Sequence, residues 1–238
     1  MKARRAETEP ARRLVRRGRI TVHYQSSALP REQAAAFAAL AARGLREVER
    51  LAGLSPAARL RFEVRDGTRI STARGRTILL SSYRIVSSTA PYLHEIAHVL
   101  LPCRRAPPWY SEGLASYIES LVSERGGGYD SRLFTPDGNR GVDADASRWL
   151  ADPRGQHVLP FIGSRGTPRG ILADRYNVAA PFYVLSHSLV KFLAERAGIA
   201  VLIRLARAKR FSPALRRLTG KSAAAWRASW LETVRISS

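Results

Sequence analysis

The sequence has very little cysteine and no long hydrophobic run. Its single cysteine, Cys103, excludes an intrachain disulfide framework. No apolar stretch is long enough to span a bilayer, and residues 1–18 lack the hydrophobic region of a signal peptide. We therefore expect a cytoplasmic protein as the sequence is written, or an exported one if a misassigned start codon hides a leader. At 238 residues the chain can form one domain with a small extension.

Acidic residues are also scarce, so the net charge is strongly positive. Asp and Glu total 19 against 40 Lys and Arg, which gives +21. Residues 1–20 carry eight basic and two acidic side chains, a net +6, and the other 218 residues carry 32 minus 17, or +15. Such a charge could attract nucleic acid or an anionic surface. Four lysines against 36 arginines are equally well explained by the codon bias of a GC-rich genome, and no helix-turn-helix, zinc-finger or RNA-binding signature accompanies the charge.

Two common catalytic motifs are missing as well. The sequence has no G-x-S-x-G elbow, which leaves a serine hydrolase without local support. It also has no G-x-x-x-x-G-K-[ST] loop for nucleotide phosphates.

The motif that is present is HEIAH at residues 94–98. On a helix, residues four apart project from the same face, so His94 and His98 can bind one Zn²⁺. Glu95 lies about 100° further round the axis, where its carboxylate can reach the activated water without binding the metal. This pattern is typical of a zinc-dependent hydrolase.

The residues around this motif predict a helix. Ser88 or Thr89 offers an N-cap, Pro91 falls in the first turn, and Pro102 ends the helix. The apolar residues fall on the side away from the histidines; they are Leu93, Ile96 and Leu100.

A catalytic zinc site needs a third protein ligand. The next carboxylate is Glu112, in a second predicted helix from about Ser111 to Ser123. A short connection between the two helices can bring it back onto the histidine pair. For an isolated glutamate in a first turn, interaction with the helix dipole is the simpler interpretation. After HEIAH, metal binding is the better hypothesis.

Together, HEIAH and the following PPWYSEGLASY resemble the gluzincin metallopeptidases, specifically the short-spaced peptidase MA-like domains. The resemblance implies one Zn²⁺ per chain held by His94, His98 and Glu112, with Glu95 as general base and a peptide or protein as substrate. No glycine and third histidine follow at the metzincin spacing, so the metzincin clan is disfavoured. Cys103, between the two helices, could be a fourth ligand but is more simply an ordinary loop thiol.

The resemblance extends to the segment Tyr183–Gly198, which is similar to a gluzincin helix that begins with a transition-state tyrosine. It implies that Tyr183 stabilises the oxyanion. Tyr183 and His187 share a helix face away from the apolar stripe of this segment, so both could line a cleft. A half-buried tyrosine and a surface histidine remain the alternative.

The remaining pattern predicts an α+β, zincin-like fold with a small N-terminal sheet and a mainly helical C-terminal lobe. Residues 1–18 are expected to be a disordered basic arm, and residues 19–238 the peptidase MA-like domain. Residues 125–175 are expected to be irregular loops, and the strand at 77–82 to be the edge that pairs with substrate. The other predicted strands are 19–25 and 60–65, and the other predicted helices are 31–52, 179–197, 199–208, 212–219 and 222–235.

We hypothesise a zinc-dependent peptidase. Two alternatives remain open: a catalytically inactive metal-binding interaction module and a basic nucleic-acid-associated protein.

Overall fold

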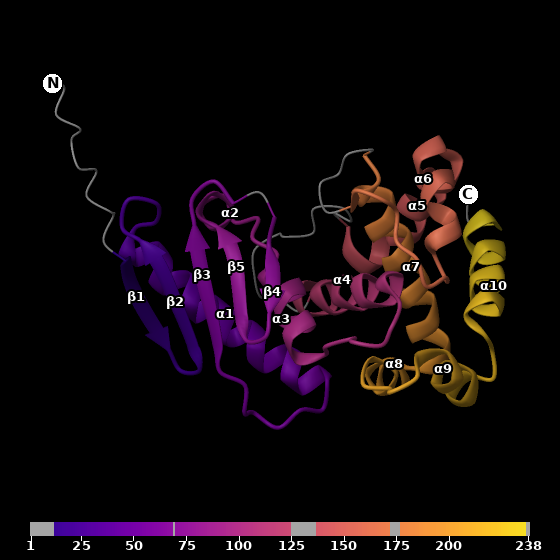
Figure 1. Cartoon of the computed structure of the whole chain (residues 1–238), viewed down its shortest axis with the longest axis horizontal. Helices are drawn as coiled ribbons and strands as arrows, with labels where there is room; N and C mark the ends of the chain where they lie inside the picture. Colours follow the sequence, from indigo (N-terminus) through magenta and orange to yellow (C-terminus); the bar gives the residue numbers. More distant parts are fainter. Residues whose placement is uncertain (1–11, 69, 125–136, 172–176, 237–238) are drawn as a thin grey trace, which may run out of the picture.

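A five-stranded mixed sheet forms one end of the molecule (Figure 1). The computed structural model describes residues 12–68, 70–124, 137–171 and 177–236. The strand order is β1-β2-β3-β5-β4. The inner strands β2, β3 and β5 are parallel, and β1 and β4 pair antiparallel at the two edges. The strands are β1 (Arg12–Arg17), β2 (Ile20–Gln25), β3 (Leu60–Arg65), β4 (Thr72–Arg74) and β5 (Thr77–Ser81).

The sheet differs from the prediction at both edges. Residues 12–17 of the expected basic arm form β1, and residues 1–11 lie outside the described residues. Gly18, at φ +55°, supplies the left-handed residue that a tight turn into β2 needs. At the other side, β5 is an inner strand because β4 pairs along it, so the predicted substrate edge is wrong for 77–82.

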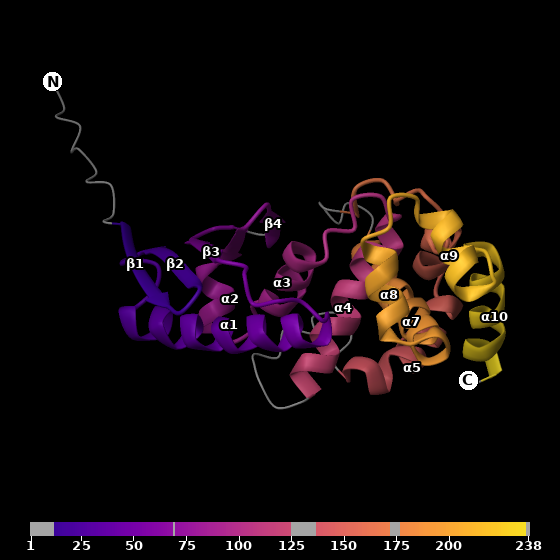
Figure 2. The same cartoon turned by 90° about the horizontal axis from the view of Figure 1, so that it is seen from below.

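Helix α1 (Arg31–Leu51) covers one face of this sheet (Figure 2). Its apolar side is fully buried and includes Phe37, whose ring packs edge-on against Phe62 of β3 at 5.2 Å. Alternate side chains of β2 and β3 are buried on the same face, as expected for strands with one side packed and one side solvated. The sheet and α1 therefore form one layered unit.

The rest of the chain is helical and lies at the other end of the molecule (Figure 1). In the described part, no helix combines the length and apolarity that crossing a bilayer requires. Helix α7 is central, with Phe182, Leu185 and Leu189 completely buried. The helices are α2 (Ser82–Val86), α3 (Tyr92–Leu100), α4 (Pro108–Glu124), α5 (Gly138–Ala151), α6 (Pro153–Val158), the 3₁₀ turn η1 (Leu159–Phe161), α7 (Ala179–Ala197), α8 (Ile199–Ala206), α9 (Phe211–Thr219) and α10 (Ala223–Ile236).

The segment predicted to be irregular contains two helices, so this expectation is wrong for residues 138–158. Val142 and Ala146 are completely buried one turn apart on α5, which packs against α7. Asp152 then begins α6 by accepting a hydrogen bond from the backbone N–H of Arg154 at 2.8 Å. Gly155 allows the sharp turn, since a Cβ there would lie 1.8 Å from the carbonyl oxygen of Trp149.

Candidate metal centre

Helix α3 carries the HEIAH motif, and its position depends on close packing against α1. The helix begins at Tyr92 with Pro91 as its N-cap, so the predicted cap at Ser88 or Thr89 is wrong. It ends at Leu100, just before Pro102 as predicted. A Cβ on Gly44 of α1 would lie 2.6 Å from Leu93 and 2.9 Å from Tyr92. A glycine at this position therefore lets α3 approach α1 and fixes the histidine face of α3 on the opposite side.

Helix α4 carries Glu112, and a second glycine controls its position. The helix begins at Pro108, one turn earlier than predicted. A Cβ on Gly113 would lie only 2.3 Å from the carbonyl oxygen of Ser186 in α7. Because Gly113 lacks this atom, α4 can pack directly against α7, and Glu112 reaches the region between α3 and α7.

Three potential metal ligands meet between these helices. The Nε2 atoms of His94 and His98 are 3.0 Å apart, and each lies 3.2 Å from Oε2 of Glu112. Within the described residues, these three form a group of His, Cys, Asp or Glu side chains that could hold a metal ion. His94 is buried, and His98 and Glu112 are half-buried. We refer to His94, His98 and Glu112 as the metal triad.

The triad fits zinc in both chemistry and spacing. Two imidazole nitrogens and one carboxylate oxygen form a common ligand set for catalytic zinc, with bonds of about 2.0–2.2 Å. Tetrahedral ligands at that bond length are about 3.3 Å apart, close to the observed separations of 3.0–3.2 Å. All three atoms can therefore contact one ion with little movement, and a tetrahedral ion would have one further position for water or substrate.

The outer nitrogens of both histidines have polar neighbours on α4. The hydroxyl oxygen of Ser111 lies 3.5 Å from Nδ1 of His98, and that of Ser116 lies 3.5 Å from Nδ1 of His94. The buried carboxylate of Glu119 lies 3.8 Å from the same nitrogen of His94. Such partners orient a histidine so that Nε2 faces the metal. Sequence reasoning missed Glu119, although its spacing of seven from Glu112 places both on one face of a helix.

Glu95 is also buried, next to the triad but outside it. Burial raises the pKa of its carboxyl group, while His94 and His98 act in the opposite direction. Burial alone would lower the pKa of His94, but the hydrogen bond to Glu112 and the charges of Glu112, Glu119 and Glu95 together outweigh burial and raise the pKa to about 9. The site is therefore an electrostatically coupled group in which each charge depends on its neighbours.

Tyr183, at the start of α7, faces the triad. Its ring centroid lies 5.9 Å from that of His94, and its hydroxyl is hydrogen-bonded to Glu112. Burial and the nearby carboxylates raise the pKa of the phenol. The hydroxyl therefore keeps its proton at neutral pH and can act as a hydrogen-bond donor.

His187, one turn further along α7, does not line the site. It is completely buried, and its Nε2 lies 2.7 Å from Oδ1 of Asn139. The amide oxygen is an acceptor, which places the imidazole proton on Nε2. Burial lowers the pKa of His187 to about 3, so the side chain is neutral. The expectation of a surface or cleft residue is wrong, and His187 instead links α7 to α5.

Cys103 lies in the connection between α3 and α4 but is not part of the metal triad. Burial raises the pKa of its thiol to about 12. A thiol must be deprotonated to bind zinc, so this environment disfavours a role as fourth ligand.

Comparisons with known proteins agree with this geometry at the level of the fold. Neither a family model nor a curated protein matches the sequence. The M1 zinc metallopeptidase from Deinococcus radiodurans matches with a TM-score of 0.59 and 18% identity, over 93% of this chain and 51% of that chain. A mutant of that enzyme bound to a Tyr-Ser-Ala substrate gives a TM-score of 0.56 at 19% identity, over 93% and 52%. A two-domain M1 zinc metallopeptidase mutant bound to L-tryptophan gives 0.55 at 18%, over the same shares.

The chain thus spans about half the length of the structures it matches. At this identity the likeness concerns the fold alone. The α+β fold is gluzincin-like, as the sequence resemblance predicted.

Proposed function

We propose that this protein is a zinc-dependent peptidase, with His94, His98 and Glu112 holding the ion. One observation carries the proposal: three ligand atoms from two helices meet at 3.0–3.2 Å in a gluzincin-like fold. When bound, zinc lowers the pKa of a water molecule to about 7 and polarises a carbonyl group. We assign the activity to the domain that was predicted at residues 19–238, and we extend this domain to include β1.

Glu95 is the general base in this proposal. It lies beside the triad on α3, and its buried carboxylate is kept apart from the bulk solvent. The carboxylate accepts a proton from the attacking water as the oxygen bonds to the peptide carbonyl carbon. It then returns that proton to the departing amine as the C–N bond breaks. The products are a carboxylate and an amine, and Glu95 is regenerated.

Tyr183 is proposed to stabilise the oxyanion that forms during this attack. Its protonated hydroxyl, beside Glu112, can donate a hydrogen bond to the negative carbonyl oxygen. As negative charge develops, the Tyr183 hydroxyl would exchange its hydrogen bond to Glu112 for one to the oxyanion. Tyr183 therefore acts on the transition state more than on bound substrate.

An extended peptide is the proposed substrate. Strand β4 is the edge of the sheet on the side that contacts α3, so its outer backbone groups can pair with a peptide. A related structure binds a tripeptide substrate, which supports this class. Thr72–Arg74, rather than residues 77–82, is therefore the proposed edge strand that pairs with substrate.

Neither alternative has a supporting observation of its own. An inactive metal-binding module would need the triad but not Glu95 as a base. A nucleic-acid-associated protein would rest on the net charge of +21 alone.

Replacing Glu95 with Gln tests the proposal. The amide keeps the shape of the side chain but cannot accept a proton, so turnover of a peptide library should fall about 10²–10⁴-fold. Zinc content and the circular dichroism spectrum should be unchanged. Glu232→Gln, on the exposed side of α10, is the matched control and should keep full activity.

Equal peptide hydrolysis by wild type and Glu95→Gln would reject the catalytic role. A wild-type protein that holds zinc but cleaves no peptide in the library would favour the inactive metal-binding module.

A further inference from the structure

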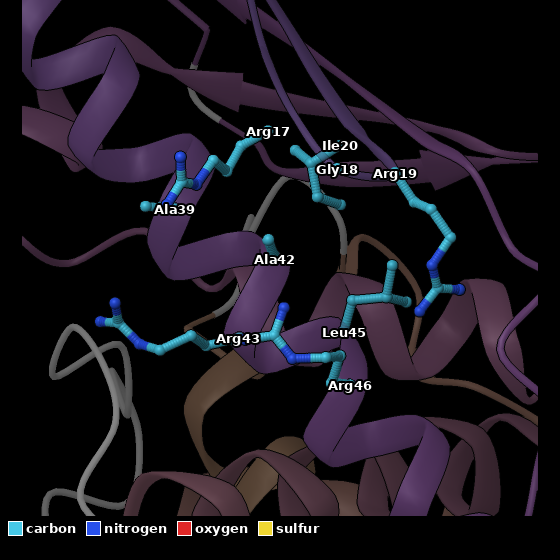
Figure 3. Close-up of a pocket in the computed structure, with 9 residues that line it drawn as sticks. All are labelled: Arg17, Gly18, Arg19, Ile20, Ala39, Ala42, Arg43, Leu45 and Arg46. Atoms are coloured by element: carbon cyan, nitrogen blue, oxygen red, sulfur yellow. The ribbon is translucent and has the colours of Figure 1, made fainter.

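A second cluster of charge lies on the sheet side of the molecule, in an open pocket between the β1–β2 turn and α1 (Figure 3). Its volume is about 380 Å³. Figure 3 shows Arg17 at the end of β1 and Arg19 in the turn, with side chains that extend in different directions, and Arg43 and Arg46 projecting from α1. None of the lining residues belongs to the helices that carry the metal triad or Tyr183. We refer to this feature as the arginine pocket.

Only one of the four arginines is neutralised by an acidic side chain in the described structure. Arg19 forms two hydrogen bonds of 2.5 Å with the buried carboxylate of Glu49. Among the described residues, no hydrogen bond or ion pair joins the side chain of Arg17, Arg43 or Arg46 to another group. These three side chains are exposed and present three positive charges to one pocket.

This arrangement has a small energetic cost. Arg43 and Arg46 are three residues apart on one helix face, where like charges repel each other weakly. The nearby Glu47 forms its ion pair with Arg50. A bound anion would remove the repulsion between the two arginines.

The shape of the pocket favours a small ligand. Small side chains at Ala39 and Ala42 leave the hollow, and the half-buried Ala39 together with the aliphatic parts of the arginine side chains gives it an apolar wall. Its volume lies within the range of small-molecule sites, about 300–1,000 Å³. A bare inorganic anion would leave much of this space and the apolar wall uncovered.

From these observations we infer that the arginine pocket binds the phosphate group of a small phosphomonoester. A phosphomonoester carries about two negative charges at neutral pH, which match the unneutralised arginines better than the single charge of a carboxylate. Guanidinium groups form paired hydrogen bonds with phosphate oxygens. The organic part of the ligand would contact Ala39 and the aliphatic parts of the arginine side chains.

Isothermal titration calorimetry with phenyl phosphate and with inorganic phosphate tests the site. Wild-type protein should bind about one phenyl phosphate per chain, and more tightly than inorganic phosphate because the ring covers the apolar wall. The double variant Arg43→Gln/Arg46→Gln should bind it at least tenfold more weakly, since two charge-assisted contacts are lost. Arg216→Gln/Arg217→Gln, exposed on α9, has the same change in charge and should bind within twofold of wild type.

Ala39→Phe provides a second test that leaves the charge unchanged. The ring should fill the hollow and weaken phenyl phosphate binding by a similar factor, while circular dichroism confirms the fold. Equal weakening in the pocket and control double variants would show a general charge effect and overturn the proposal. Undiminished binding in Arg43→Gln/Arg46→Gln would place the anion elsewhere, including at the metal triad. Binding of a single-stranded oligonucleotide but of neither phosphate probe would replace the inferred ligand with nucleic acid.

Discussion

The metal triad and the arginine pocket gather charged or ionisable side chains in opposite ways. The triad combines nitrogen donors with a carboxylate at 3.0–3.2 Å, and further polar groups contact the outer nitrogens of both histidines. The pocket collects exposed groups of one sign, of which Arg19 alone has an acidic partner in the described structure.

The difference follows from burial. A buried ionisable group is costly unless it is paired, so the composition and spacing of a buried cluster restrict what it can bind. Exposed arginines repel each other only weakly in water. The arginines themselves therefore do not define a binding site. The concave shape around them indicates one, and binding experiments test it. A net charge of +21 therefore indicates no particular ligand, whereas the five residues of HEIAH predict a metal site and a class of reaction.

The largest effect among the variants that sharpen this comparison is expected from Tyr183→Phe. The variant keeps the ring but removes the proposed oxyanion donor, so kcat should fall about 100-fold. KM and zinc content should change little, because the hydroxyl acts in the transition state. Steady-state kinetics with a peptide substrate measures both. Tyr83→Phe, at a side chain that is 72% exposed, should behave as wild type. An unchanged kcat, with chemistry shown to limit the rate, would leave Tyr183 a packing residue.

A smaller effect is expected from two glutamates of α1. Glu49 is 3% exposed and pairs with Arg19, which is 24% exposed, whereas Glu47 and Arg50 are both largely exposed. Glu49→Gln should lower the free energy of unfolding by about 1–3 kcal/mol, because Arg19 keeps its charge without a full partner. Glu47→Gln should change it by less than about 0.5 kcal/mol. Urea denaturation measures the free energy of unfolding of both variants. Equal losses of stability would contradict the claim that burial makes the Glu49 pair the more important one.

Much of the fold could be predicted because its signals are local. Helices α1 and α7 begin where their apolar periodicity begins, and α7 ends at the predicted residue. The strands β2 and β3 alternate in burial as their sequences indicate. By contrast, the pairing of β4 beside β5 depends on long-range contacts that periodicity does not contain.

The error at His187 has a physical cause in the packing of α7. Periodicity separates the faces of one helix but cannot show that neighbours cover both faces. Helix α7 is packed between α4 on one side and α5 and α10 on the others, so its polar residues are buried too. Ser188, for example, bonds to Asp143 of α5 and accepts a hydrogen bond from Trp230 of α10. The histidine pair was predictable from a spacing of four. Glu112 was predictable as the next carboxylate after HEIAH, and the family resemblance supported it. Glu119 became evident only from the packing of α4 on α3.

Metal analysis of purified protein tests the central claim most directly. Inductively coupled plasma mass spectrometry should find about one zinc per chain in wild type and in His157→Ala, whose histidine is exposed on α6. Zinc should be nearly absent from His94→Ala/His98→Ala and strongly reduced in Glu112→Gln, which preserves the size of the side chain. Circular dichroism should show that both variants fold. Full retention of zinc by the folded double-histidine variant would contradict the metal triad, and with it the proposed peptidase.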